Sequence, residues 1–463
     1  MGLGEIASLE FVSRWTFMTV ARPKRCLQRA VLPREVWTLV LLECCRSSRA
    51  RGFCAERDYL RSVWDEFDRF VAGTPIFWSE VRVDLFTGVE SLLAAIASSK
   101  GIALHLIVDL RSDLAEWEID TELDGDPHQV KLLQCLDVVR SVSFKWRTVC
   151  CQVDRELYLE VARDFLESSP APMLTCLDIE STVVDLQPRV RVFKDTLPSL
   201  RQLRIVAFPF VWIRDATFGS LATLELRAIS PLHFTSVSVF AALLEGLSVT
   251  LESLVLAGMG FSVHGLDQHA PFAMPLLENL EIVFGYGSPM QDNAVMTMLA
   301  GIDFPSLRSL KIENAGDEAV AHLATAVPFL RNVINLVVVG GLMGRTSIDC
   351  LLRAVPGLSS LDLRAAPYEF AEELAALPDV LPNVVALRFD ALDTSSVLTY
   401  VLVRDALGLP PIERLYGVQE AVSPLTPSQI VAVEELSKIG GIFVDASLES
   451  SLHRSIVSGS ART

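Results

Sequence analysis

A short pattern of apolar residues, apolar-x-x-apolar-x-apolar, recurs along the chain from about residue 146. Clear copies begin at Leu200, Leu277, Leu307 and Leu358, each of them close behind a proline. The last two apolar positions alternate with other residues, as in Leu361-Asp362-Leu363, which predicts a short strand with one buried face. Successive copies lie 21 to 30 residues apart, and their first positions are residues 146, 174, 200, 221, 251, 277, 307, 333, 358, 384 and 412.

The segments between these predicted strands have the periodicity of helices. One apolar stripe at i, i+3, i+4 and i+7 is made of Ile348, Leu351, Leu352 and Val355. A single strand and helix cannot bury both of their apolar faces, so we expect the units to stack on one another. The spacing is close to the roughly 20–29 residues of leucine-rich repeats. Because the repeats lack the usual Asn or Cys after the strand, we predict an α/β fold in the form of an irregular leucine-rich-repeat solenoid, with a parallel sheet on its concave side and helices on its convex side.

The rest of the chain divides into shorter segments. We expect an N-terminal extension over 1–29, a helical segment over 30–80, the solenoid over 81–445 and a disordered Ser-rich tail over 446–463. Within 30–80, the pattern predicts one helix from about Leu32, a basic loop over 46–57 and a second helix from about Tyr59. Inside the solenoid, residues 109–126 hold eight carboxylates, which favours a solvated acidic insertion.

Composition and charge exclude several classes of function. The formal net charge of −17 argues against binding to nucleic acid or to an anionic membrane, since both need clustered positive charge. The nine cysteines contain no CxxC pair, which favours free thiols in a reducing compartment over disulfides or a zinc site. No apolar run reaches the roughly 18–20 residues of a membrane span. We therefore expect a cytoplasmic or nuclear protein without a metal or other cofactor.

The helical segment carries a resemblance to a known family. Leu32-Pro33-Arg34-Glu35 opens an apolar helix, the second helix has Val63 with Phe67 four residues on, and Thr74-Pro75-Ile76-Phe77-Trp78-Ser79 follows. This order resembles an F-box, and most closely the F-box-like proteins abundant in mushroom-forming fungi. A strand at 81–85, a helix at 89–98, a strand at 102–106 and the stretch Lys145–Val149 are also similar to that family.

The resemblance implies a substrate-recognition adaptor of a Skp–cullin–F-box type ubiquitin ligase. In such proteins the F-box docks onto a Skp-type adaptor of a cullin–RING ligase, while the repeats hold a target protein. Carried over to this sequence, the docking residues are Leu32, Pro33, Glu35, Val36, Leu39, Val63, Phe67 and Trp78. Two alternatives stay open: a repeat scaffold whose F-box-like segment is only a structural cap, and an enzyme. The sequence offers no convergent acid, base, nucleophile or phosphate loop for the enzyme.

Overall fold

A computed structural model describes residues 38–39, 41–42, 52–63, 65–111, 127–183, 197–208, 218–228, 237–259, 270–285, 289–326, 328–364, 368–390, 394–418 and 426–438. The chain forms two compact units, residues 1–152 and 153–463. Each unit is described separately below.

The first unit begins with helices. Helix α4 (Gly52–Val63) and helix α5 (Asp65–Gly73) are followed by the 3₁₀ helix η2 (Pro75–Trp78). The predicted loop over 46–57 is therefore wrong from Gly52 onward, where α4 begins. The reason is that Arg57 is a buried residue, with its guanidinium 4.4 Å from the centre of the Trp78 ring. A basic residue that indicates an exposed loop in the sequence belongs here to the inner face of a helix.

A βαβ arrangement follows in the same unit. Strand β1 (Glu80–Asp84) lies one residue before its predicted range, and helix α6 (Val89–Ser98) has its predicted range. Strand β2 (Leu104–Leu110) begins two residues and ends four residues later than the predicted strand at 102–106, and it pairs with β1 in parallel. Strand β2 includes Asp109, so the predicted acidic insertion starts too early; residues 112–126 lie outside the described part. Helix α7 (Pro127–Arg140), the 3₁₀ helix η3 (Ser143–Lys145) and strand β3 (Trp146–Val153) complete the series.

The second unit contains a large parallel sheet. Its strands run side by side in the order β4 (Cys176–Ser181), β5 (Gln202–Val206), β6 (Thr223–Arg227), β7 (Ser253–Ala257), β9 (Asn279–Val283), β11 (Ser309–Glu313), β12 (Asn335–Val339), β13 (Ser360–Arg364), β14 (Ala386–Asp390) and β15 (Arg414–Val418). The register aligns equivalent positions of the predicted repeat. The direct neighbours on successive strands include Leu280, Leu310, Leu336 and Leu361. The second and third apolar positions of the repeat are buried throughout the clear copies, as predicted.

Each strand of this sheet starts two residues later than the pattern predicts. The first apolar residue closes a tight turn instead, as where Leu307 donates its N–H to the Phe304 carbonyl at 3.2 Å. Pro305 occupies the second position of that turn, where its fixed φ is favourable. After the turn, the N–H groups of Arg308 and Ser309 both donate to the Glu278 carbonyl, at 2.9 and 3.0 Å. This shared carbonyl recurs at the other strand starts from β5 to β15.

The strand ends also show a regular feature. The residue after the strand adopts a left-handed conformation, with φ between 50° and 60°, at Ala207, Ala228, Gly258, Asn314 and Gly340. Its N–H donates to the last carbonyl of the next strand, as from Ala228 to Ala257 at 2.7 Å. The same turn therefore links the ends of neighbouring strands at each of these positions.

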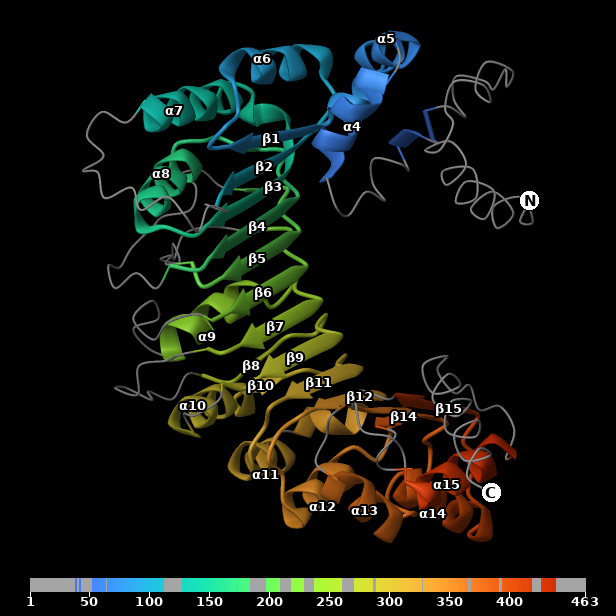
Figure 1. Ribbon diagram of the computed structural model, residues 1–463. Coiled ribbons are helices and arrows are strands. Elements are labelled where there is room, and N and C mark those ends of the chain that lie inside the picture. The colour runs from blue at the N-terminus through green and yellow to red at the C-terminus, as the bar shows by residue number, and fades with distance from the viewer. Residues whose placement is uncertain are drawn as a thin grey trace. The chain divides into compact units, whose positions relative to one another are not determined.

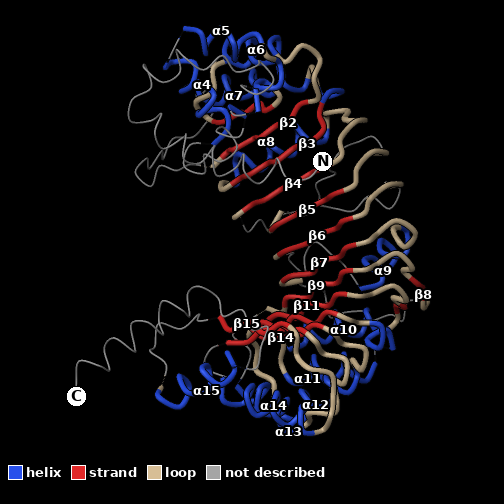
Figure 2. The backbone as a smooth tube through the Cα atoms, turned by 90° about the vertical axis from the view of Figure 1, so that its right-hand side faces the viewer, coloured by secondary structure: helices blue, strands red, loops and turns tan. Residues whose placement is uncertain are grey.

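Helices cover one face of the sheet in the second unit (Figures 1 and 2). Each helix from α10 to α14 packs against the next helix in the chain, up to α15. The helices of this unit are α8 (Glu156–Glu167), α9 (Val237–Gly246), α10 (Pro289–Ala300), α11 (Asp317–Ala326), α12 (Arg345–Ala354), α13 (Tyr368–Ala376), α14 (Thr394–Ala406) and α15 (Pro427–Lys438). The 3₁₀ helix η4 covers Pro328–Asn332. A small separate sheet consists of the parallel strands β8 (Phe272–Ala273) and β10 (Ile302–Asp303). The repeat-like α/β fold with a large parallel sheet is therefore confirmed for this unit. The predicted N-terminal extension over 1–29 and the predicted tail over 446–463 lie outside the described residues.

Candidate protein-interaction surface

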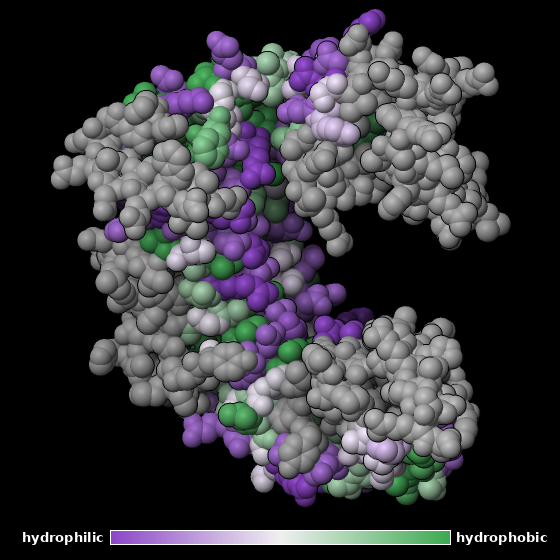
Figure 3. All heavy atoms as spheres, in the orientation of Figure 1, coloured by the Kyte–Doolittle hydropathy of each residue, from purple (hydrophilic) through white to green (hydrophobic). Residues whose placement is uncertain are grey.

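The described helices of the second unit lie on one face of its sheet and leave the other face open (Figures 1 and 2). Because side chains alternate along a strand, the residues between the buried leucines point to this open face. The middle residue of each strand forms a continuous row, which we call the middle row: Asp178, Arg204, Glu225, Val255, Glu281, Lys311, Val337, Asp362, Arg388 and Tyr416. Figure 3 shows hydrophilic residues predominating along the stacked strands, with smaller hydrophobic areas among them.

Two further rows flank the middle row. At the strand starts the first row is mostly uncharged and polar, with Gln202, Thr223, Ser253, Asn279, Ser309, Asn335 and Ser360. At the strand ends the last row mixes charge and small apolar side chains, with Glu180, Val206, Arg227, Ala257, Val283, Glu313, Val339 and Arg364. The open face therefore presents three parallel rows that differ in chemistry.

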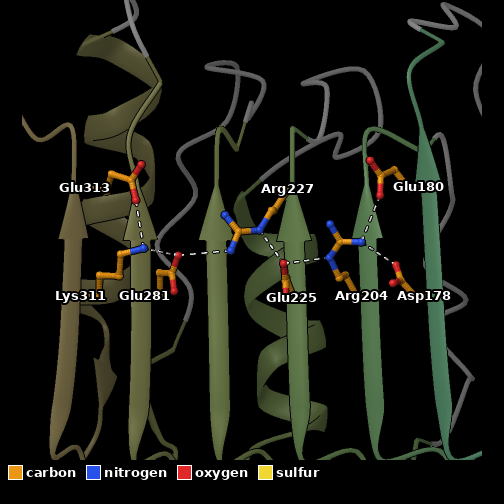
Figure 4. A network of polar contacts seen from close by, with 8 residues as sticks. All are labelled: Asp178, Glu180, Arg204, Glu225, Arg227, Glu281, Lys311 and Glu313. Carbon is orange, nitrogen blue, oxygen red and sulfur yellow. Dashed lines mark hydrogen bonds and ion pairs between the residues drawn. The ribbon is translucent and has the colours of Figure 1, made fainter. Parts of the chain in front are cut away.

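Charges of opposite sign meet on neighbouring strands of the open face (Figure 4). Arg204 lies between Asp178 at 2.8 Å and Glu225 at 3.1 Å, and it also contacts Glu180 at 3.3 Å. Such cross-strand pairs stabilise a sheet. Further along, Lys311 contacts Glu281 at 3.1 Å and Glu313 at 3.0 Å. We call these residues, with Arg227, the charge network; it joins five strands.

One link of the charge network crosses a strand. Arg227 on β6 contacts Glu225 on its own strand at 2.5 Å and reaches Glu281 on β9 at 3.3 Å, with β7 lying between them. The last-row residue of β7 is Ala257, which is buried. A methyl side chain at this position leaves room for the guanidinium of Arg227 to pass above the strand. Figure 4 shows this contact spanning the strand that carries no sticks.

The network holds its basic groups strongly protonated. Partial burial lowers the pKa of Arg204, but hydrogen bonds and the charge of Asp178, with Glu180 and Glu225, outweigh this and raise the pKa overall. The pKa of Arg227 is raised by Glu225 and Glu281 against the same effect of burial. The pKa of Lys311 is raised by Glu313 and Glu281 in the same manner. All three groups therefore sit in a field dominated by carboxylates.

A second cluster lies on β13 and β14. Asp362, whose side chain is 14% exposed, contacts Arg364 at 2.6 Å and lies 3.8 Å from Arg388. Two guanidinium groups surround one carboxylate here, so these three residues carry a net positive charge. Between this cluster and the charge network, β12 contributes the apolar residues Val337 and Val339.

The predicted docking residues belong to the first unit. Leu32, Pro33, Glu35 and Val36 lie outside the described residues, while Val63 and Phe67 fall within α4 and α5 without a described side chain. Leu39 is helical and 68% exposed. Trp78 is 5% exposed. The two predicted docking residues whose side chains are described therefore differ: one faces solvent and the other is buried.

Trp78 belongs to a small core. It packs with Leu41, Leu42, Val71, Phe77 and Ala95, and its indole Nε1 donates to the Val71 carbonyl at 2.9 Å. The guanidinium groups of Arg57 and Arg61 lie 4.4 and 5.1 Å from its ring centre, a cation–π arrangement. This packing fixes the end of η2 against the preceding helices.

In the ranges described, no group of three or more His, Cys, Asp or Glu side chains could hold a metal ion. Burial raises the pKa of the Cys54 thiol to about 12, so this cysteine is not a reactive thiolate. None of the described helices combines the length and hydrophobicity needed to cross a membrane.

Comparisons with known proteins add little. No known family matches the sequence, and no curated protein is similar to it. Among solved structures, a crystal structure of a protein from Bacteroides fragilis aligns with 68% of this chain and 69% of its own chain, at 14% sequence identity and a TM-score of 0.29. A likeness at that TM-score carries no argument about function.

The charge network was missed by sequence reasoning, although the sequence holds a signal for it. When the repeats are aligned on their strands, the middle position changes sign from Asp178 to Arg204 to Glu225, and again from Glu281 to Lys311. A solvated strand face has no need of such alternation. Reading the repeats in register, rather than along the chain, would have predicted the network.

Proposed function

We propose that this protein is an adaptor that binds a target protein on the open face of its repeat sheet. The observation that carries the proposal is the open face itself, because side chains from consecutive strands form continuous rows there. Parallel rows on a solenoid provide an extended binding surface of the kind that repeat proteins use. The face mixes charged, polar and small apolar side chains. Charge complementarity on such a face favours some partners over others.

The second part of the proposal concerns the ligase. We propose that residues 30–80 dock onto a Skp-type adaptor of a cullin–RING ubiquitin ligase, so that the bound target is presented for ubiquitination. This part rests on the order of the F-box-like motifs in the sequence. It is also supported by the exposed Leu39 beside the buried pair Leu41 and Leu42, an arrangement that leaves an apolar side chain available for contact.

The test of the ligase part is co-purification of the full-length chain with a Skp-type adaptor. Deleting residues 30–80 should abolish the co-purification while the repeat unit stays folded by circular dichroism. The double change Leu32→Ala with Pro33→Ala should weaken docking by about 1–3 kcal/mol, the strength of ordinary interface anchors. Binding that persists after the deletion would contradict the assignment of the docking segment.

A repeat scaffold without a ligase is the second candidate. The buried Trp78 favours it, because a side chain that fills the core of the first unit is not available at a docking surface. In that case the segment acts as a structural cap, which solenoids need at their ends. A folded full-length protein that shows no adaptor binding would decide for the scaffold.

A further inference from the structure

The carboxylates of the charge network outnumber its cations and can accept further hydrogen bonds. Five carboxylates face three cationic groups, which leaves a net charge of −2. Within the described residues, each carboxylate uses a single oxygen in these contacts: Oδ1 of Asp178, Oε2 of Glu180, Oε1 of Glu225, Oε1 of Glu281 and Oε2 of Glu313. No described residue contacts their second oxygens, and the side chains are 22–36% exposed.

The cluster on β13 and β14 provides a comparison within the same sheet, because both oxygens of its carboxylate already accept hydrogen bonds. Both oxygens of Asp362 accept hydrogen bonds from Arg364, and the Nε atom of Arg388 lies 3.8 Å from Oδ1. There the cations outnumber the acid. The two ends of the open face therefore differ in sign, and only the β4–β11 end has an excess of carboxylate oxygens among the described side chains.

We propose that the β4–β11 part of the open face binds a Lys- or Arg-containing extended segment of the target protein. This inference rests on the proposed function, since it names the chemistry of the target that the repeats would hold. Charge complementarity identifies the occupant: the free oxygens accept hydrogen bonds from cations, and the raised pKa values of the three basic groups reflect the same negative field. Val255, between Glu225 and Glu281, adds an apolar contact within the charged surface.

The spacing of the carboxylates suggests how the cations are arranged. In the middle row, Asp178, Glu225 and Glu281 recur on every second strand. Strands lie about 4.8 Å apart, so these carboxylates recur at about 9.6 Å. A polyproline II segment advances about 3.1 Å per residue and returns to the same face every third residue, a repeat of about 9.3 Å. An extended segment that crosses the strands with a cation at every third residue therefore matches the row.

The test uses the full-length protein and a fluorescein-labelled peptide of five Arg-Pro-Ser repeats, with binding followed by fluorescence anisotropy. The wild-type protein should bind this peptide and should not bind the matching Glu-Pro-Ser peptide. The double variant Glu225→Gln with Glu281→Gln should bind about tenfold more weakly, because two acceptor charges are lost from the face. Circular dichroism and thermal unfolding check that each variant is folded.

A matched control separates the local surface from the net charge of the chain. Glu372→Gln with Glu373→Gln removes the same charge from helix α13, on the side of the sheet that the helices cover, and should change the affinity by less than about twofold. A third variant should change the affinity for the peptide in the opposite direction. Arg204→Gln removes the cation that competes for three carboxylates, so it should strengthen peptide binding by about threefold.

Several results would overturn the inference. These are no binding of the Arg-Pro-Ser peptide, equal loss in the Glu372/Glu373 control, or weaker binding by a folded Arg204→Gln variant. The outcome is independent of the ligase, because the peptide assay contains no Skp-type adaptor. Peptide binding without adaptor co-purification would support the surface and remove the ligase part; the reverse result would keep the ligase part and refute the basic target.

Discussion

The repeat sheet of the second unit and the helical segment of the first unit use charged side chains in opposite ways. On the sheet, Arg204 and Lys311 lie on an open face and pair with carboxylates. In the helical segment, Arg57 is buried and stacks on Trp78, with its Nη1 atom 3.5 Å from the Phe77 carbonyl. The same residue type therefore serves a surface in one unit and a core in the other.

The difference shows where a sequence pattern is informative. A repeat presents the same position many times, so the open-face residues can be recognised by their register across strands. The helical segment occurs once, and nothing in its sequence distinguishes an exposed residue such as Leu39 from a core residue such as Trp78. The predictions below test this contrast, and they begin with the largest expected effect.

The repeat register would be tested most strongly by truncating a buried leucine. Leu310 and Leu361 are 0% and 1% exposed, at equivalent positions of β11 and β13. Changing either to Ala should lower the free energy of unfolding by about 2–5 kcal/mol, because a cavity remains in a stacked core. Denaturant unfolding provides the measurement. Leu342→Ala is the control, since this leucine is 87% exposed and should cost less than about 0.5 kcal/mol. Equal effects at Leu310 and Leu342 would contradict the register.

The end of the repeat unit contains a fully buried arginine, unlike the partly exposed arginines of the open face. Arg404 on α14 is 1% exposed and donates to the Tyr400 hydroxyl. Its guanidinium also donates to four backbone carbonyls, those of Leu381, Pro382, Val384 and Pro410. These bonds fix the segments on either side of β14.

Replacing Arg404 with Met keeps most of the volume and leaves those carbonyls without their donor. The free energy of unfolding should fall by about 2–4 kcal/mol, again measured by denaturant unfolding. Arg353→Met is the matched control, because Arg353 is 58% exposed and, within the described part of the chain, its ion pair is with Asp349 one helical turn away; its loss should cost less than about 0.5 kcal/mol. A stable Arg404→Met variant would show that the carbonyls find other partners.

How far the sequence predicts this structure depends on the kind of residue concerned. The strands around Leu310 and Leu361 follow from the alternation of apolar residues, and helix α12 follows from the apolar stripe that begins at Ile348. Helix α7 was not predicted, because Val130 and Leu133 on it are apolar and yet exposed, which hides the apolar stripe.

Other features depend on contacts between residues far apart in the chain. The stacking of Arg57 on Trp78 joins residues 21 positions apart, and the reach of Arg227 to Glu281 crosses a whole strand. Neither contact leaves a local pattern in the sequence. The candidate surface could be predicted only as the open face of a sheet, while its charge network required the register of the strands.

Trp78 provides the sharpest comparison within the helical segment. Trp78→Phe retains a ring but loses the hydrogen bond to the Val71 carbonyl and reduces the cation–π contacts. We expect the free energy of unfolding of the first unit to fall by about 1–2 kcal/mol. Leu39→Ala should leave stability within about 0.5 kcal/mol of wild type and should lower co-purification with a Skp-type adaptor if the docking assignment holds. A Trp78→Phe protein of unchanged stability would place this side chain outside the core.

The smallest expected effect is a pH dependence in the first unit. Asp109 on β2 contacts Arg82 at 2.6 Å and Arg111 at 2.9 Å, and its side chain is 8% exposed. The hydrogen bond from Arg111 lowers the pKa of this carboxyl below its ordinary value of 3.8, in spite of the opposing effect of burial. Because the folded pKa is depressed, the carboxylate contributes stability at pH values above 3.8, and this contribution is lost as the pH falls through the lower pKa of the folded state.

Asp109→Asn removes the titrating group, so the difference in thermal midpoint between wild type and variant should be constant from about pH 7 to pH 5 and should shrink below about pH 4. A difference that stays constant down to pH 2 would show that the ion pairs of Asp109 do not stabilise the fold. Glu90→Gln, an exposed acid in the first turn of α6, controls for the general effect of acid on the unit.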